Sequence, residues 1–184
     1  MVLDISNAVI LDTETTGLDS NARIVEISGI CAESGRVLFN ELVNPLCSIP
    51  LQAQSIHGIT DSMVSGARTF DVVWNNIKEY LFDRKLVIYN FSFDCRMIAQ
   101  SLSDFDYPVD NLSYFLKGDC AMLWYAEYFG VWNENHDGFK WQSLTNACNQ
   151  QGVDTSDLTA HRALADCQMT RRLIQKVNSN NQIL

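Results

Sequence analysis

The sequence predicts an α/β fold, with a mixed sheet whose faces are covered by helices. Residues 8–43 contain three strand-like runs joined by short turns, which is the pattern of an antiparallel meander. After residue 70, helical periodicity alternates with a further short strand, as expected where helices cover a sheet. The chain has 184 residues and no repeat or linker-like tract. We therefore expect a single domain over residues 1–184.

The predicted strands are short and rich in Ile and Val, which favour extended backbone. An apolar run at residues 8–11 ends in two acids one residue apart. The other predicted strands cover residues 23–31 (RIVEISGIC), 36–43 (RVLFNELV) and 86–89 (LVIY).

The predicted helices follow from apolar residues at three- and four-residue steps. Residues 70–82 show this spacing most clearly. Ser92 can cap a helix that follows the 86–89 strand. Further helices are predicted over residues 121–129, 141–151 and about 161–178.

The remaining segments are predicted to be short or irregular. Thr60 or Asp61 can cap one further turn of helix. Residues 104–117 show no clear period, and residues 131–139 read as a polar loop. We expect residues 179–181 to fray.

The charge balance limits the classes of partner. The chain has 22 acidic and 13 basic residues, a formal charge of -9. This disfavours a broad grip on phosphates, which depends on Lys and Arg. An enzyme that holds only a chain end through divalent metals, or one that carries a carboxylate cluster, fits the charge.

Neither a membrane span nor a secreted fold is expected. No apolar run approaches the roughly 20 residues that span a bilayer, and the start lacks the basic residues of a signal peptide. Six cysteines occur without a C-x-x-C pair, so the spacing indicates free thiols and not a zinc cage or disulfide framework. We expect a cytoplasmic protein with no membrane partner.

Asp12 and Glu14, at the end of the 8–11 run, are the first candidate metal ligands. Strand side chains alternate, so these two acids point to one side, roughly 7 Å apart along the backbone. Like charges at the end of a buried strand are costly unless a cation lies between them. Gly17 then provides a flexible turn. The pair reads as half of a metal site, with an ordinary polar strand end as the alternative.

Asp94, His161 and Asp166 are candidates to complete the site. The two acids each have a simpler explanation, since acids favour the first turn of a helix and exposed helix faces. Five residues at 3.6 per turn place His161 and Asp166 about 140° apart on a helix. The two can share one site only if His161 lies at or before the helix start.

Three motifs occur in order: D-x-E at Asp12 and Glu14, N-x-x-F-D at residues 90–94, and H-x-x-x-x-D at His161 and Asp166. They resemble the three motifs of the DnaQ-like (DEDDh) 3′-5′ exonucleases, particularly the exonuclease X and DNA polymerase III epsilon proofreading members. Shorter matches cover IVEI at 24–27, VNP at 43–45, QA at 52–53, IH at 56–57 and HRALADC at 161–167. The resemblance implies a ribonuclease H-like fold, a mixed five-stranded sheet flanked by helices.

The resemblance also implies a metal-dependent exonuclease that uses two divalent cations, Mg²⁺ or Mn²⁺, both suited to oxygen ligands. By resemblance, Asp12 bridges both ions, Glu14 and Asp166 complete one of them, and Asp94 acts partly through water. His161 is the implied general base. These five residues are the implied catalytic set.

The implied substrate is the 3′ end of a nucleic acid, preferably single-stranded DNA, released as 5′-mononucleotides. By resemblance, the residues that contact the terminal nucleotide are Thr15, Leu18, Ile56, His57, Asn90 and Phe93. Ordinary core packing is the alternative for Ile56 and Phe93. Tyr89 stands where relatives often carry His.

Three alternatives remain open at this point. The same chemistry could act on short RNA, or the fold could serve as a catalytically silent nucleic-acid-binding subunit. A metal phosphatase for small esters is the third. The residues leave protein partners, oligomeric state and pathway open, DNA repair being one candidate.

Overall fold

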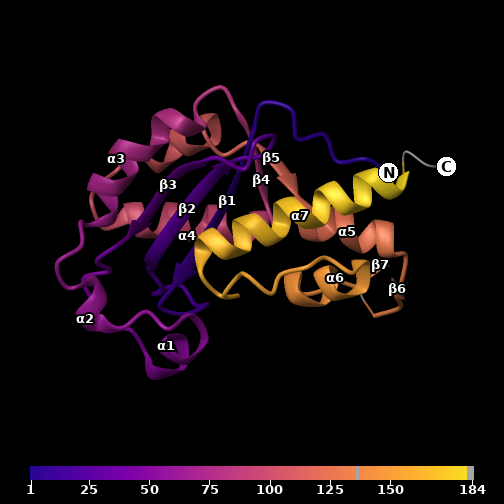
Figure 1. Ribbon diagram of the computed structural model, residues 1–184. Helices are drawn as coiled ribbons and strands as arrows, with labels where there is room; N and C mark the ends of the chain where they lie inside the picture. The colour runs from indigo at the N-terminus through magenta and orange to yellow at the C-terminus, as the bar shows by residue number, and fades with distance from the viewer. Residues whose placement is uncertain (136, 182–184) are drawn as a thin grey trace.

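The computed structural model describes residues 1–135 and 137–181. Its centre is a five-stranded sheet in the order β3-β2-β1-β4-β5, with helices on both faces (Figure 1). Strands β1, β2 and β3 are antiparallel neighbours, whereas β4 and β5 run parallel to β1. The predicted α/β class and the mixed five-stranded sheet are confirmed.

The three meander strands occupy nearly the predicted positions. They are β1 (Ala8–Thr15), β2 (Ile24–Cys31) and β3 (Val37–Leu42), followed later by β4 (Lys85–Ile88) and β5 (Gly118–Cys120). Strand β5 lies just after the segment without a clear period and was not predicted. Gly118 passes so close to Leu86 that an added Cβ would lie 1.8 Å from its carbonyl oxygen, so this pairing requires glycine.

One face of the sheet is covered by α3 (Phe70–Leu81), α4 (Phe91–Ser103) and the 3₁₀ helix η1 (Val109–Tyr114). Val9 and Leu11 of β1 point into this layer, where Trp74 is fully buried. The apolar stripe predicted for residues 70–82 is therefore the core face of α3.

The opposite face is covered by α5 (Ala121–Phe129), α6 (Leu144–Gln151) and α7 (Ala163–Asn181). Ala8 and Ile10 of β1 point to this side. Helix α7 lies along β1 and β2 (Figure 1). Because both faces of β1 are apolar, its polar end is the point where the core stops and the site begins.

Two small units lie outside these layers. Helices α1 (Leu51–His57) and α2 (Asp61–Val64) form a lobe at the lower left of Figure 1. The predicted polar loop at 131–139 instead contains a small hairpin of β6 (Trp132–Asn133) and β7 (Gly138–Phe139). That prediction was wrong, because two-residue strands are too short to show a period.

Three predicted helix starts also need correction. Helix α4 starts at Phe91 with Asn90 at the N-cap, not Ser92. Helix α6 starts at Leu144, because Ser143 caps it by accepting the Asn146 N–H at 3.2 Å. Helix α7 starts at Ala163, two residues after the predicted start.

The predicted fraying of residues 179–181 was also wrong. Helix α7 continues to Asn181, whose side-chain amide donates to the Met1 carbonyl at 2.9 Å. This contact holds the helix end against the N-terminus, which a local sequence pattern cannot reveal. All six cysteines are free, as predicted. Within residues 1–135 and 137–181, no helix is long and apolar enough to cross a membrane.

Candidate active site

The site forms where β1 leaves the core. Ala8 and Ile10 face the α7 layer, and alternation continues this series through Asp12 and Glu14. A register shift follows between Glu14 and Thr15, so the strand loses its regular pairing just beyond the second acid. The strand therefore presents two carboxylates on one side at its carboxyl end.

Asp166 joins these two acids from the first turn of α7. One carboxylate oxygen each from Asp12, Glu14 and Asp166 lies within 4.8 Å of the other two. Asp166 Oδ1 accepts the backbone N–H of His161 at 3.3 Å. The three converging acids form the oxygen-rich arrangement that hard divalent cations prefer.

Asp94 approaches from the other face of the sheet. It is 3% exposed and lies in the first turn of α4, where the helix dipole favours a negative charge. The Thr13 hydroxyl donates to Asp94 Oδ1 at 2.7 Å. Asp94 lines the same cavity as Asp12 and Asp166, so alternate residues of β1 organise acids from both helix layers.

Burial makes this cluster costly to ionise without a cation. Burial, followed by repulsion from Asp94 and Asp166, raises the pKa of Asp12 well above its ordinary value. Burial and repulsion by Asp166 raise the pKa of Glu14 to about 8. Burial raises the pKa of Asp94 to about 7, although the Thr13 hydrogen bond opposes the rise. Burial also raises the pKa of Asp166. A bound cation would offset these penalties, so the residues fit a metal site.

His161 lies just before α7, as sharing a site with Asp166 requires. Its φ of 62° places the backbone in the left-handed region, which is uncommon for a residue with a Cβ. This turn directs the exposed His161 to the rim of the cavity that Asp12, Asp94 and Asp166 line. A neutral imidazole there could accept a proton beside the metal-binding acids.

The segment after His161 is anchored to β2. The two oxygens of the buried Glu26 carboxylate accept the Arg162 Nε–H at 3.1 and 3.2 Å, and one of them also accepts the Ala163 N–H at 2.8 Å. Glu26 lies opposite Glu14 across the β1–β2 ladder. The start of α7 is therefore tied to the strand next to the acids.

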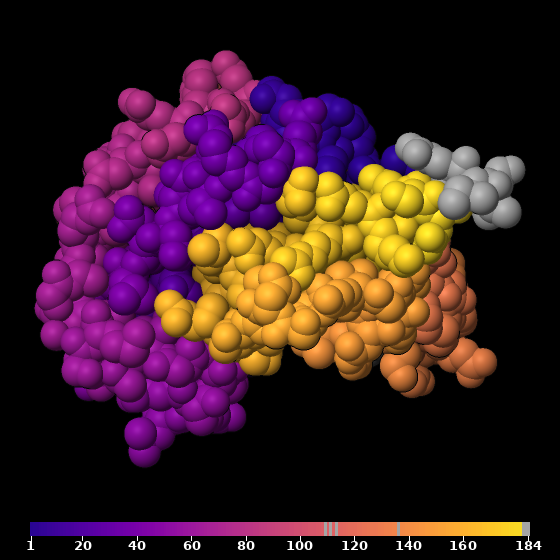
Figure 2. All heavy atoms as spheres, in the orientation of Figure 1, coloured from indigo at the N-terminus to yellow at the C-terminus, as the bar shows by residue number. Residues whose placement is uncertain are grey.

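A second cavity of about 500 Å³ adjoins the acidic one and shares Thr13, Glu14 and Phe93 with it. Helix α1 forms one wall. Figure 2 shows the lower outline of the molecule notched between the violet atoms of this lobe and the orange-yellow atoms leading into α7. Five of the six predicted nucleotide contacts line this cavity: Thr15, Leu18, Ile56, His57 and Phe93. The sixth, Asn90, lines the acidic cavity instead.

His57 brings a buried donor to the second cavity. Its Nδ1 accepts the Ile59 N–H at 3.0 Å, so the other nitrogen, Nε2, carries the proton. That Nε2 has no hydrogen-bond partner among the described residues. Burial lowers the pKa of His57, and the nearby Thr15 backbone opposes this shift. A neutral, unpaired donor of this kind suits a polar ligand atom.

Sequence reasoning missed the supporting residues. Thr13 and the Glu26–Arg162 pair orient the acids and the His161 turn, but no role was predicted for them. The only local signal is an acid inside the apolar run IVEISGIC, since a buried carboxylate needs a partner. The sequence cannot identify that partner, which lies 136 residues away.

The exonuclease family model RNase_T matches residues 9–174, nearly the whole chain. The chain belongs to this exonuclease family. It is 41% identical over 168 residues to the uncharacterized exonuclease CP81 of Escherichia phage 186, covering 90% of this chain and 85% of that protein. It is 34% identical over 183 residues to DNA polymerase III subunit epsilon of Buchnera aphidicola subsp. Schizaphis graminum, covering 95% and 75%.

A solved structure gives the same answer for the fold. Exonuclease X in complex with 5′ overhanging duplex DNA superposes with a TM-score of 0.65 and 27% identity, covering 95% of this chain and 93% of that one. The DnaQ-like assignment and the ribonuclease H-like fold are thus confirmed. This exonuclease carries its acidic cluster at the end of the central strand β1.

Proposed function

We propose that residues 1–184 act as one exonuclease domain that removes 5′-mononucleotides from the 3′ ends of single-stranded DNA with Mg²⁺ or Mn²⁺. The observation that carries the proposal is the approach of Asp12, Glu14 and Asp166 within 4.8 Å beside a cavity large enough for a nucleotide. Carboxylate oxygens favour Mg²⁺ or Mn²⁺ over softer metals.

Asp12, Glu14, Asp94 and Asp166 would hold the two cations. When bound, the ions neutralise the phosphoryl oxygens, lower the pKa of the attacking water and stabilise the leaving oxygen. By the resemblance to the DnaQ-like family, Asp12 would help to hold both ions, and it is the acid whose ionisation Asp94, Asp166 and Glu14 all oppose. Thr13 keeps the Asp94 carboxylate oriented through its hydrogen bond.

His161 would take the proton from the attacking water. Its position at the rim of the acidic cavity leaves the imidazole open to solvent, so the proton can pass on to water. The Asp166 and Glu26 contacts hold the two ends of its turn. A base placed in this way contributes about 10²–10⁴-fold to rate.

The terminal nucleotide would occupy the second cavity. Leu18 and Ile56 are exposed there, by 77% and 54%, so their side chains are available to pack against a bound nucleotide. Apolar contacts with Leu18, Ile56 and Phe93 tolerate any base. His57 Nε2 would donate to a polar atom of the nucleotide, and Asn90 would support the metal side.

The support for DNA comes from relatives. Exonuclease X was solved with 5′ overhanging duplex DNA, and the epsilon protein is a subunit of a DNA polymerase by name. By the same analogy we propose a cytoplasmic role in DNA repair. The -9 charge favours brief, distributive contact over a clamp along the strand.

The test uses 5′-labelled DNA and RNA strands of equal sequence with Mg²⁺, with Mn²⁺ and with a chelator. We expect stepwise shortening from the 3′ end of DNA, release of 5′-mononucleotides, and no reaction with the chelator. A strand with a blocked 3′ end and a circular strand are the controls. Faster cleavage of RNA would assign the RNA alternative. Activity on nitrophenyl phosphate alone would assign the phosphatase.

A further inference from the structure

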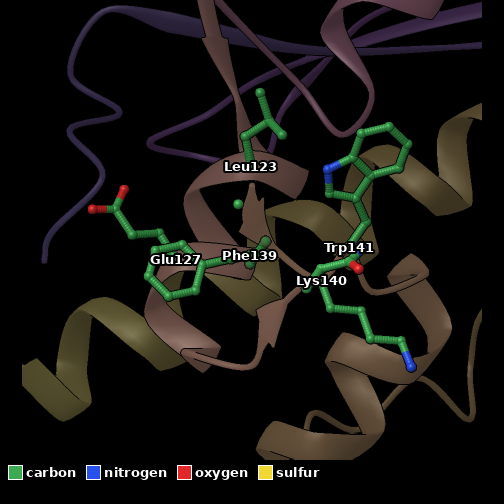
Figure 3. Close-up of a pocket in the computed structure, with 8 residues that line it drawn as sticks. Leu123, Glu127, Phe139, Lys140 and Trp141 are labelled. Carbon is green, nitrogen blue, oxygen red and sulfur yellow. The ribbon is translucent and has the colours of Figure 1, made fainter. Parts of the chain in front are cut away.

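A third cavity lies outside the acidic site, between α5 and the β6–β7 hairpin. It has a volume of about 680 Å³. Figure 3 shows Leu123, Phe139 and Trp141 around this cavity, with the Lys140 side chain pointing away from it. Most of its wall is apolar, and it shares no described lining residue with the acidic cavity or the terminal-nucleotide cavity.

The rim of this cavity exposes large apolar side chains. Trp141 is 65% exposed and Leu123 is 52% exposed. Trp132, which does not line the cavity itself, is 53% exposed. The Trp132 ring meets Phe139 edge to face, with centroids 5.4 Å apart. The Lys140 N–H donates to the Val131 carbonyl at 2.7 Å, which ties down the segment that bears Trp141. These exposed apolar side chains gather beside one cavity, where they are available to contact a ligand.

The cavity is connected to the acidic site by a short stretch of chain. The Tyr89 hydroxyl donates to the carbonyl of Gln142, the residue after Trp141, at 2.9 Å. Tyr89 and Leu144 line the acidic cavity. Three residues span at most about 10 Å, so Trp141 lies within a few nucleotides' length of the acids. Trp141 is connected to the acidic cavity on the side where Leu144 lines it. Helix α1 and the terminal-nucleotide cavity adjoin the acidic cavity on another side, at Glu14 and Phe93.

The charge of the molecule favours bases over phosphates as the group bound here. The net charge of -9 disfavours holding a strand mainly through its phosphates. The one basic residue among the described lining residues is Lys140, and its side chain points away from the cavity (Figure 3), so it is not placed to bind a phosphate there. Stacking of bases on aromatic rings needs no net positive charge and accepts any base.

We infer that the groove lined by Leu123, Phe139 and Trp141 binds unpaired bases of the substrate strand upstream of the scissile bond, with Trp141 as the principal stacking residue. The inference rests on the proposed exonuclease function. A protein partner or a second copy could also cover an apolar groove. Continuity with the acidic cavity through residues 141–144 favours the strand.

The experiment compares Trp141→Ala with wild type on a thymidine dinucleotide and on an oligothymidylate of about 12 nucleotides. That length lies within the roughly 4–16 nucleotides covered by a single-strand site. Losing one base stack should lower the preference for the long substrate, as the ratio of kcat/KM values, by roughly 5- to 100-fold. The lower kcat/KM on the long substrate should come from a higher KM, with kcat little changed. Trp141→Phe should recover most of it, and Phe82→Ala, which removes a ring 56% exposed at the end of α3, serves as surface control.

Three results would overturn the inference: an unchanged preference, equal losses on both substrates, or a concentration-dependent dimer that Trp141→Ala abolishes. A binding assay separates this inference from the exonuclease proposal. The oligothymidylate should quench tryptophan fluorescence of the Asp12→Asn variant, and Trp141→Phe should remove that quenching. If wild type hydrolyses neither substrate but the quenching persists, the exonuclease proposal fails while the groove is supported. Absence of quenching in an active enzyme contradicts the groove alone.

Discussion

Glu26 and Arg162 form a bidentate ion pair between β2 and the residue that precedes α7. The Glu26 side chain is 3% exposed, whereas that of Arg162 is 37% exposed. The same carboxylate accepts the Ala163 N–H at 2.8 Å. Arg162 therefore neutralises an acid that lies opposite Glu14, and Glu26 fixes the turn that carries His161.

Glu26→Gln should lower kcat by about 10-fold or more while KM for an oligonucleotide changes little. The amide keeps the size of the side chain but loses charge-assisted bonds, each worth about 1.5–3 kcal/mol. The His161 turn then loses its anchor, whereas the terminal-nucleotide cavity keeps its walls. Steady-state kinetics at saturating metal provide the measurement.

The matched control is Glu41→Gln, which breaks the more exposed Arg68–Glu41 pair at 2.8 Å and should leave kcat within twofold because surface pairs contribute little. Arg162→Met should lower the free energy of unfolding by about 1–3 kcal/mol, because the buried Glu26 carboxylate loses its cationic partner and, of its described donors, keeps only the Ala163 N–H. Full activity in Glu26→Gln would show that the pair only stabilises the fold.

Local patterns predicted most of the fold. Strands β1 and β2 and helix α3 bury apolar residues along their length, so their own residues reveal them. Strand β3 buries only Phe39 fully, and its β-favouring residues after a short turn indicated it. Strand β5 has three residues and depends on pairing with β4. The end of α7 depends on Met1, 180 residues away. Elements that depend on distant contacts have no local signature.

In the candidate site, too, some features have a local sequence signal and others depend on contacts between distant residues. Strand alternation predicted that Asp12 and Glu14 point together. Helix geometry required His161 to lie at or before the start of the last helix if it shares a site with Asp166. The Thr13–Asp94 hydrogen bond joins residues 81 positions apart, and the Glu26–Arg162 pair joins residues 136 apart. Such pairs become visible only once the sheet brings their elements together.

Asp12→Asn should nearly abolish hydrolysis and raise the melting temperature of the metal-free protein. Asp94, Asp166, Glu14 and Glu26 all repel the charge of Asp12. Asp12→Asn therefore removes a metal ligand and also relieves this repulsion. Hydrolysis assays and thermal unfolding in chelator test both halves. Asp83→Asn is the control, because Asp83 is an exposed acid before the amino end of β4, at the opposite end of the parallel strands from the acidic cluster. Near-normal turnover in Asp12→Asn would show that Asp12 is not a metal ligand needed for hydrolysis.

The metal-free protein should lose stability as pH rises from about 4 to about 8. Glu14 and Asp94 have folded pKa values of about 8 and about 7, above the roughly 4 expected in the unfolded chain. In that window the folded state binds more protons than the unfolded state, so the free energy of unfolding falls with rising pH.

Mg²⁺ or Mn²⁺ should reverse this loss, and metal affinity should rise over the same window, because cations compete with these protons. The measurement is the melting temperature at about pH 5, about pH 6.5 and about pH 8, with chelator and with metal. The surface acids Asp4, Asp154 and Asp157 have lowered pKa values and so affect stability only below about pH 4. Metal-free stability that rises between pH 5 and 8 would contradict the raised pKa values.

His161→Asn should lower kcat by about 10²–10⁴-fold at saturating metal. Asn is the appropriate replacement, because it tolerates the left-handed backbone at residue 161, whereas Ala would combine side-chain loss with strain. Asn cannot act as a base, so the variant should lose the rise in activity that a neutral imidazole provides at higher pH. Metal titrations should change little, since His161 is not among the proposed ligands.

Added imidazole provides the decisive comparison for His161, whose exposed position leaves room for a small base. Imidazole should restore part of kcat in His161→Asn but none in Asp12→Asn, where the metal arrangement itself is lost. His57→Ala should instead raise KM, because His57 lines the terminal-nucleotide cavity. If His161→Asn weakens metal binding sharply and keeps the wild-type pH profile, His161 is a ligand and another group must take the proton.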